Sequence, residues 1–355
     1  MAICLIFVNN AMDNSKKPTL TVAMPNYNDS RFISTAIEAI LNQSRQPDEF
    51  IICDDGSSDN SIEIIQAYAK RYPIIKLIRN ETNVGNVNIV NVLINAAAGD
   101  YLYFAASDDY ILPGFLEKSM DMLKKYPDAG FSASFLYNMN ERGKKTGIGY
   151  VPGMSREKGF MAPNKIFDIV CKIGSPEMFS ANTMVFKRRS IIEAGGFPTE
   201  IRYFNDVVMS AAIAARHGAC FIPEPLVCIR QRMLSYSSSY FNNPELFNEA
   251  IGNAVRYMRD KYSGVLPARY IGAFEKNMSY DGYFYNLSAA RRSMLNQYIN
   301  LPLRLTPAFL SMATYAIDAI MCLNYLREHR LSIGTYAMNY IDAVLYMRKN
   351  RHLLD

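Results

Sequence analysis

The sequence predicts an α/β protein built on an open, mostly parallel and doubly wound sheet. The first observation behind this prediction is that short apolar runs alternate with amphipathic segments of helix length, three times in succession before residue 100. The second is that polar loops rich in Asp, Asn and Ser follow these runs. The third is size, because 355 residues, 50% of them hydrophobic, suffice for one large domain with an appendage or for two domains.

The individual elements follow from periodicity and from turn residues. The apolar run 19–23 predicts a strand, and Asp29 or Ser30 is expected to cap the helix that ends near Asn42. Residues 138–175 show poor periodicity and are expected to form long loops over the sheet edge. Further strands are expected at 50–53, 74–78, 101–106, 129–136 and 220–229, and further helices at 61–71, 84–98, 114–126, 207–217 and from 243 onward.

Two adjacent carboxylates, Asp108 and Asp109, follow the expected strand 101–106. In an open α/β sheet, ligands bind at the carboxyl ends of the strands. Paired acids at such a place suit a hard divalent cation, which in turn holds phosphates. The alternative is an acidic turn that caps the next helix.

A second acidic pair, Asp54 and Asp55, follows the strand 50–53 at the same expected edge. Gly56 suits a tight turn and a serine after it could cap the next helix, which is a structural account of this loop. That account does not explain the two carboxylates, which could accept hydrogen bonds from a base or a ribose. Tyr27, in the first loop, offers a flat face on which a base could stack.

Together these motifs resemble those of the family 2 glycosyltransferases, which have the GT-A fold. These enzymes transfer a sugar from a nucleotide diphosphate to an acceptor, with inversion at the anomeric carbon. The resemblance extends over roughly residues 20–237. It rests on motifs that occur in the family's order, namely Pro25-Asn-Tyr-Asn28, Asp54-Asp-Gly-Ser-Ser-Asp59, Asn83-Val-Gly85, Gly99-Asp-Tyr101 and Ser107-Asp-Asp109.

The resemblance implies roles for individual residues. Tyr27 would stack on the nucleobase, and Asp55 with Asp54 would bond the base or the ribose. Asp108, with Asp109 beside it, would coordinate a Mn²⁺ or Mg²⁺ ion that binds the diphosphate. The full donor-binding set predicted from the sequence consists of Pro25, Tyr27, Asp54, Asp55, Asn83, Ser107, Arg230 and Arg232.

Two departures from the family pattern change the charge at this edge. The usual Asp-x-Asp would begin at Ala106, so only its last acid remains, as Asp108. Family members often carry Arg-x-His after a later strand, and here Arg232 occupies the histidine position, where it cannot ligate a metal. With Arg230 it could neutralise the leaving diphosphate. The alternative is a pair of surface arginines.

Asp206 stands at the start of the expected helix 207–217, so a helix N-cap would account for it. An inverting transfer, however, needs one carboxylate that takes the proton from the acceptor hydroxyl. The resemblance places this general base at Asp206. It also implies that a strand at 181–189 and a short helix at 191–197 carry the acceptor side of the site.

The resulting hypothesis is an inverting glycosyltransferase that moves a sugar from a nucleotide diphosphate sugar, such as a UDP-sugar, to a glycan or a lipid-linked acceptor. By analogy with the family, it would act in cell-surface polysaccharide or lipid-linked oligosaccharide synthesis. A sugar nucleotidyltransferase is disfavoured because no Gly-rich loop with a basic residue follows the first strand. A non-catalytic nucleotide-sugar-binding or scaffolding protein stays open because of Ala106, Asn205 and Arg232.

The net charge of +5 is concentrated in the tail, because residues 256–355 carry +6. No nucleic-acid-binding motif accompanies this charge, so nucleic acid is not an expected partner. We expect peripheral membrane contact or homo-oligomerisation through the C-terminal helices instead. The apolar run 305–326 is more typical of a buried or interfacial helix than of a membrane span.

The expected organisation is a poorly ordered leader at 1–17, a GT-A domain at 18–240 and a helical C-terminal region at 241–355. The opening apolar run lacks a basic flank and a small-residue cleavage site, which disfavours a secretory signal. The six cysteines form no CxxC pair and are expected to be buried free thiols. These observations favour a cytoplasmic protein, on the cytoplasmic membrane face if the tail docks there.

Overall fold

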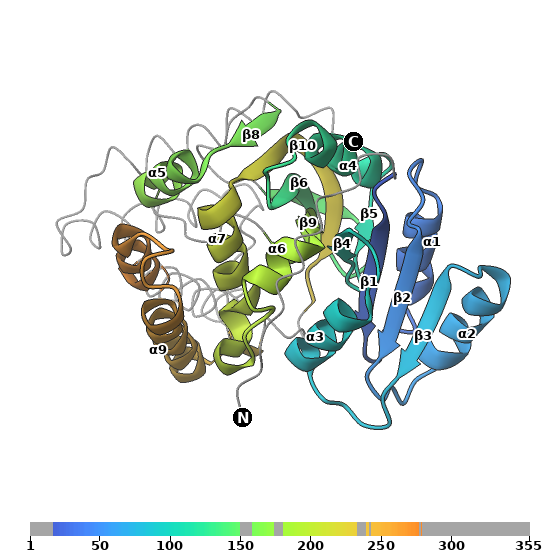
Figure 1. Cartoon of the computed structure of the whole chain (residues 1–355). Helices are drawn as coiled ribbons and strands as arrows, with labels where there is room; N and C mark the ends of the chain where they lie inside the picture. Colours follow the sequence, from blue (N-terminus) through green and yellow to red (C-terminus); the bar gives the residue numbers. More distant parts are fainter. Residues whose placement is uncertain are drawn as a thin grey trace, which may run out of the picture.

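The protein is shown as a computed structural model in Figure 1. The structure describes residues 17–149, 158–173, 180–232, 239–240, 243–276 and 278. The expected leader, apart from Lys17, and the apolar run 305–326 lie outside the described residues.

The strands form one sheet whose first part is parallel. Its order is β3-β2-β1-β4-β9-β6-β10-β5, with β7 added to β6 and β8 added to β10. Strands β3, β2, β1 and β4 are mutually parallel, as are β6 and β10, whereas β9 runs antiparallel between β4 and β6. The α/β class and the mostly parallel sheet are therefore confirmed. The strands are β1 (Leu20–Asn26), β2 (Glu49–Asp54), β3 (Ile75–Arg79), β4 (Tyr101–Phe104), β5 (Tyr110–Ile111), β6 (Phe131–Met139), β7 (Lys145–Gly149), β8 (Gly159–Met161), β9 (Met184–Lys187) and β10 (Ala219–Arg230).

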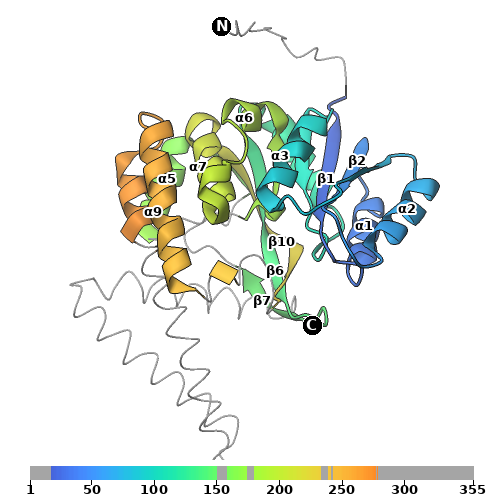
Figure 2. The same cartoon turned by 90° about the horizontal axis from the view of Figure 1, so that it is seen from below.

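Helices cover both faces of the sheet. Helices α1, α2 and α4 share a core cluster on one face, and α3, α6 and α7 share the cluster on the other. Helices α5 and α9 lie beside α7, at the end of the molecule far from α1 and α2 (Figures 1 and 2). The helices are α1 (Ile33–Leu41), α2 (Ser61–Arg71), α3 (Asn86–Ala96), α4 (Phe115–Lys125), α5 (Pro163–Ile173), α6 (Arg188–Glu193), α7 (Asn205–His217) and α9 (Pro244–Lys261), with 3-10 turns η1 (Ala181–Thr183) and η2 (Thr199–Phe204).

The apolar sequence of β1 fits its position as a central strand that is buried on both faces. Leu20, Val22 and Met24 belong to the cluster with α1, whereas Ala23 belongs to the cluster with α3. Successive side chains of a strand point to opposite faces. A strand covered by helices on both faces therefore reads as a continuous apolar run, as the run 19–23 does.

Three local predictions were wrong. Residues 138–175 contain β7, β8 and α5 and are not only long loops. The short strand β5 was not foreseen; it forms because it pairs with β10, which lies more than 100 residues later in the chain. The strand expected at 181–189 is shorter, because η1 precedes β9 and α6 begins at Arg188. Strands β5 and β8 form by pairing with β10, and β9 is limited to the residues that pair with β4 and β6. For these strands, pairing with a distant strand overrides weak local periodicity.

The first helix of the expected C-terminal region packs on the core of the preceding domain. Phe247, Ala254 and Met258 of α9 belong to the same buried cluster as residues of α7, and Phe247 packs against Phe204 with ring centres 5.6 Å apart. The core therefore shows no break at the expected boundary between residues 240 and 241. None of the helices in the described ranges is long and apolar enough to cross a membrane.

The start of β4 is held against β1 by a close approach at Gly99. The backbone N–H of Gly99 donates to the hydroxyl oxygen of Thr21 at 2.9 Å. A Cβ atom at Gly99 would lie 2.6 Å from the backbone nitrogen of Thr21. Atoms at this distance overlap, so a side chain here would push β4 away from β1.

We expect Gly99→Ala to lower the free energy of unfolding by about 1–3 kcal/mol, because the overlap forces a backbone shift in the central sheet. Denaturant unfolding measures this change. The control is Gly252→Ala in α9, where a Cβ would meet nothing within 4 Å. That substitution should raise stability by about 0.5–1 kcal/mol, since alanine is the better helix former. Equal stability of Gly99→Ala and the native protein would contradict the argument.

Candidate active site

The carboxyl ends of β1, β2, β4, β6 and β10 lie at one edge of the sheet. This follows from the pairing, because β9 is antiparallel to both β4 and β6, and β10 is parallel to β6. The polar loops after β1, β2, β4 and β10 therefore meet at this edge, as the order of motifs predicted. In open α/β sheets this is where ligands bind.

Asp54, the last residue of β2, is fully buried. Its Oδ2 accepts hydrogen bonds from Nδ2 of Asn26 at 2.7 Å and from the hydroxyl of Ser57 at 2.6 Å. Its Oδ1 accepts from the backbone N–H of Ser57 at 3.0 Å. In this arrangement Asp54 ties the end of β1 to the loop after β2 and exposes no surface to a ligand.

Asp55 holds the loop that follows β3 by hydrogen bonds. Its Oδ1 accepts from the side chain of Asn80 at 2.8 Å and from the backbone N–H of Val84 at 3.0 Å. Its Oδ2 accepts from the N–H of Gly85 at 2.9 Å. The motif Asn83-Val-Gly85 is thus anchored to the end of β2 through Asp55, a connection that the sequence did not reveal.

Five residues of the predicted donor-binding set keep part of their surface open to solvent at this edge, namely Pro25, Tyr27, Asn83, Arg230 and Arg232. The side chain of Tyr27 is 48% exposed, as stacking on a base would require. Asn83 is exposed and Pro25 is half-buried.

The centre of the edge is an ionic bridge. Nη1 of Arg232 donates to Oδ1 of Asp29 at 2.6 Å and to Oδ2 of Asp108 at 2.9 Å. The hydroxyl of Ser107 donates to Oδ2 of Asp29 at 2.6 Å. Burial and the nearby charge of Asp108 raise the pKa of Asp29, although Ser107 and Arg232 oppose them. Burial lowers the pKa of Arg232, but the two carboxylates raise it further, so this guanidinium is firmly charged.

The bridge also explains an incorrect prediction about Asp29. Helix α1 begins at Ile33 and no side chain caps it, so neither Asp29 nor Ser30 is its cap. The Asp29 carboxylate is engaged with Arg232 and Ser107 instead. Its position after β1, at the carboxyl edge of the sheet, was the signal available in the sequence.

Arg230 is held by backbone oxygens. Its Nε donates to the carbonyl of Asp108 at 2.9 Å and its Nη1 to the carbonyl of Glu141 at 2.8 Å. The guanidinium carbons of Arg230 and Arg232 lie 4.4 and 5.2 Å from the ring centre of Phe32. A cation over an aromatic face is attracted to it, so Phe32 helps to fix both arginines. No local pattern in the sequence indicated this role of Phe32.

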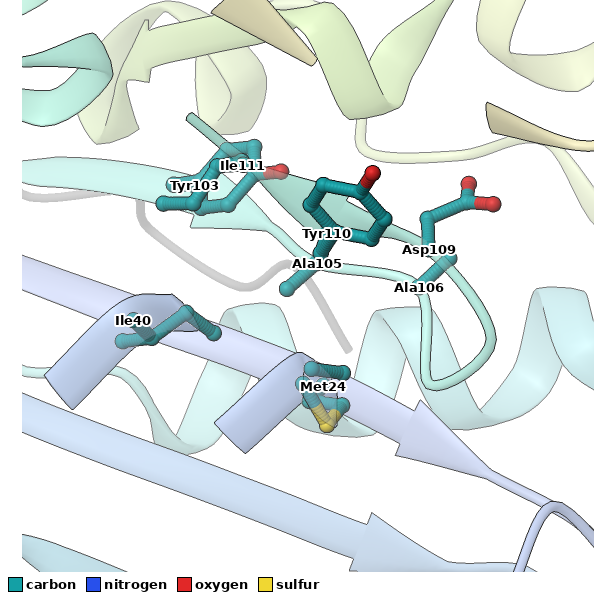
Figure 3. Close-up of a pocket in the computed structure, with 9 residues that line it drawn as sticks. Met24, Ile40, Tyr103, Ala105, Ala106, Asp109, Tyr110 and Ile111 are labelled. Atoms are coloured by element: carbon teal, nitrogen blue, oxygen red, sulfur yellow. The ribbon is translucent and has the colours of Figure 1, made fainter. Parts of the chain in front are cut away.

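The hydrogen-bond partners of Asp109 differ from those of the neighbouring residue Asp108. Its Oδ2 accepts from Nδ2 of Asn182 at 2.8 Å, and its Oδ1 accepts from the backbone N–H of Arg230 at 2.7 Å. It lines a small pocket, in which its carboxylate points away from Met24 and Ile40 (Figure 3). Burial, and then the charge of Asp108, raise the pKa of Asp109 to about 7. Asp109 therefore links β10 and η1 to the loop after β4.

The raised pKa of Asp109 predicts a pH-dependent stability. In the folded protein the Asp109 carboxyl keeps its proton up to a pH of about 7. In the unfolded chain the same carboxyl loses the proton near its ordinary pKa of 3.8. The folded state therefore binds more protons between these values, so the free energy of unfolding falls as the pH rises from roughly 4 to 7.

We expect Asp109→Asn to reduce this fall, because the amide has no proton to lose. Denaturant unfolding at several pH values, with EDTA present throughout, measures the slope. Asp128→Asn, at an exposed position, is the control and should leave the slope unchanged. Identical slopes in Asp109→Asn and the native protein would argue against a buried, protonated Asp109.

Asp206 lies in the first turn of α7, where its Oδ1 accepts from the backbone N–H of Val207 at 2.8 Å. It also accepts from the backbone of Ala181, the first residue of η1. Burial raises the pKa of Asp206 more than these N–H groups lower it. Because Asn182 of η1 bonds to Asp109, the turn η1 connects Asp206 to the edge that holds the acidic pair.

The geometry does not fit a resident divalent cation between Asp108 and Asp109. The described residues contain no cluster of three His, Cys, Asp or Glu side chains that could hold a metal ion. Asp109 is engaged with Asn182 and the backbone of Arg230. A dication on Asp108 would stand beside the Arg232 guanidinium, whose Nη1 lies 2.9 Å from the same carboxylate, and like charges repel at this range. We therefore assign no chemical step to a metal.

Comparison with known proteins identifies the domain. Residues 21–194 match the family model described as glycosyl transferase family 2. This chain carries a family 2 glycosyltransferase domain. The chain is 39% identical over 110 residues to the putative glycosyltransferase EpsE of Bacillus subtilis, covering 31% of this chain and 40% of that relative. The chain thus spans about 40% of the length of such curated relatives.

Solved structures share the fold of this family 2 glycosyltransferase domain. TarS of S. aureus in complex with UDP-GlcNAc superposes with a TM-score of 0.57 at 18% identity, covering 76% of this chain and 73% of that chain. The mannosyltransferase PcManGT of Pyrobaculum calidifontis, in complex with GDP-Man and Mn²⁺, gives a TM-score of 0.54 at 17% identity, covering 96% of this chain and 88% of that chain. At these identities the likeness shows the GT-A fold alone.

Proposed function

We propose that this protein is an inverting glycosyltransferase, which moves a sugar from a nucleotide diphosphate sugar to an acceptor hydroxyl. The observation that carries the proposal is that η1 connects a half-buried carboxylate, Asp206, to a charged edge where Asp29, Asp108, Arg230 and Arg232 meet. A base for the acceptor and cations for a diphosphate then belong to one site. The complexes of TarS with UDP-GlcNAc and of PcManGT with GDP-Man support a nucleotide sugar as donor.

The donor would lie across the loops after β1, β2 and β4. In our proposal Tyr27 stacks on the base, with Pro25 and Asn83 beside it. Asp54 and Asp55 act through the hydrogen bonds that hold these loops together. Ser107 donates a hydrogen bond to Asp29 and so helps to position the partner of Arg232.

The proposed reaction is a single displacement. Asp206 takes the proton from the acceptor hydroxyl while the oxygen attacks the anomeric carbon from the side opposite the diphosphate. The bond from that carbon to the diphosphate breaks, and its electron pair leaves with the phosphate oxygen. Arg230 and Arg232 neutralise the charge that develops there. The raised pKa of Asp206 makes its carboxylate a stronger base, as this step requires.

The remaining parts of the proposal concern the acceptor and the setting. We propose a glycan or a lipid-linked acceptor, in cell-surface polysaccharide or lipid-linked oligosaccharide synthesis. The catalytic domain would comprise residues 18–240. The basic region 241–355 would contact the cytoplasmic membrane face or a second copy of the chain. The net charge of +6 on residues 256–355 would favour contact with an anionic surface.

We expect Asp206→Asn to lower the turnover of the donor by about 10²–10⁴-fold, because the amide cannot accept the acceptor proton. Release of nucleoside diphosphate from a panel of nucleotide sugars, with candidate acceptors present, measures it. Binding of the donor should persist, because Asp206 does not belong to the proposed donor contacts. Asp128→Asn, at an exposed position, serves as the matched control and should retain native turnover.

Tight donor binding without turnover in the native protein, across all donors and acceptors, would favour the scaffolding alternative. The substitutions that motivate this alternative, Ala106, Asn205 and Arg232, all lie in or beside the proposed site. Turnover that is lost in Asp206→Asn would exclude it.

Tyr27 provides a separate test of the donor pose. We expect Tyr27→Ala to weaken nucleoside diphosphate binding by about 1–3 kcal/mol, the usual contribution of base stacking on an aromatic ring. Tyr27→Phe keeps the ring and should bind almost as well as the native protein. Calorimetric titration measures both. Equal affinity of Tyr27→Ala and Tyr27→Phe would show that the ring does not stack on the base.

A further inference from the structure

The guanidinium of Arg232 lies between two carboxylates from different loops. Asp29 follows β1 and Asp108 follows β4, and both accept hydrogen bonds from the same nitrogen, Nη1. Two carboxylates that share one positive centre are the arrangement in which proteins often bind a divalent cation together with phosphates. Here a side chain of the protein supplies the positive centre.

The hydrogen-bond capacity of Arg232 leaves a free edge for an anion. A guanidinium has five N–H donors, two of them on Nη1. Asp29 and Asp108 use both hydrogens of Nη1. Within the part of the chain that the structure describes, Nε and Nη2 make no hydrogen bond. Their fork matches two oxygens of a phosphate, which is the strong bidentate form of this contact.

The position of Arg232 is held from several sides. Phe32 lies under its guanidinium, with 5.2 Å between the guanidinium carbon and the ring centre. Ser107 fixes Asp29, which in turn fixes Nη1. The Arg232 side chain is nevertheless 25% exposed, so a ligand can reach it. Prepositioned charge lowers the cost of ordering a side chain when the ligand binds.

We propose that Arg232 takes the place of the divalent cation in this protein, so that the diphosphate of the donor binds to the Asp29–Arg232–Asp108 bridge without a metal ion. This inference rests on the proposed function, because it concerns the donor of that reaction. It departs from PcManGT, whose complex holds Mn²⁺ together with GDP-Man. It also explains why Ala106 is compatible with donor binding, since a metal ligand is not needed there.

The experiment is calorimetric titration of the full-length chain with UDP, GDP, ADP, CDP and dTDP, in excess EDTA or in Mn²⁺. We expect at least one nucleoside diphosphate to bind, with Kd values in the two conditions that agree within about twofold. Arg232→Gln should weaken this binding by about tenfold to a hundredfold in EDTA, because it loses a charge-assisted bidentate contact. Thermal unfolding verifies that the variant is folded.

A matched arginine control is Arg259→Gln on α9. Arg259 pairs with Glu275 at 2.8 Å, and both side chains are at least half exposed. This variant should bind the nucleotide as the native protein does. Loss of affinity in both variants would attribute the effect to net charge and would overturn the specific role of Arg232.

The reciprocal variant is Arg232→His, which frees the carboxylates of Asp29 and Asp108 and adds an imidazole that can ligate a metal. We expect weak binding in EDTA and at least about tenfold tighter binding in Mn²⁺, so that the substitution creates a metal dependence that the native protein lacks.

The outcomes separate this inference from the proposed function. Binding of the nucleotide to the native protein only in Mn²⁺ would overturn the inference and leave the proposed function intact. Native affinity in Arg232→Gln would also overturn the inference. Absence of binding for all five nucleotides in both conditions would overturn the proposed function, and the inference with it.

Discussion

The contact on which the proposed site depends is the ionic bridge from Arg232 to Asp29 and Asp108. Arg232 and Asp29 are 203 positions apart in the sequence, and Arg232 and Asp108 are 124 apart. The bridge can form only because β1, β4 and β10 end at the same edge of one sheet. Carboxylates from two loops would repel each other there without a cation between them. The guanidinium therefore stabilises the fold at the place where it would bind a ligand.

A second constraint acts on the other acids of this edge: a buried carboxylate needs hydrogen-bond donors. Asp54, Asp55 and Asp109 all meet it with partners from neighbouring loops. These bonds bring the loops to defined positions before any ligand arrives. An acidic motif in this family 2 domain can thus act by organising the loops that carry the exposed residues Tyr27 and Asn83.

The antiparallel strand β9 positions the turn η1, which connects Asp206 to the charged edge. Because β9 runs against β4, its preceding turn η1 lies beyond the carboxyl end of β4. Asn182 of this turn bonds to Asp109, and the backbone of Ala181 bonds to Asp206. The acid that we propose as the general base is therefore joined to the charged edge through two consecutive residues, Ala181 and Asn182. A mostly parallel sheet without β9 would offer no such connection.

The sequence alone determined the fold class, the order of β-α units and the edge at which the polar loops meet, because burial on both faces and turn chemistry are local patterns. It also singled out Tyr27, Asp108, Asp206 and Arg232 as candidates. Only the tertiary structure decided that Asp29 joins the bridge and does not cap α1, that Asp109 has partners other than those of Asp108, and that β5 forms at all. These features depend on contacts between segments that are distant in the chain, and no local pattern specifies which segments meet.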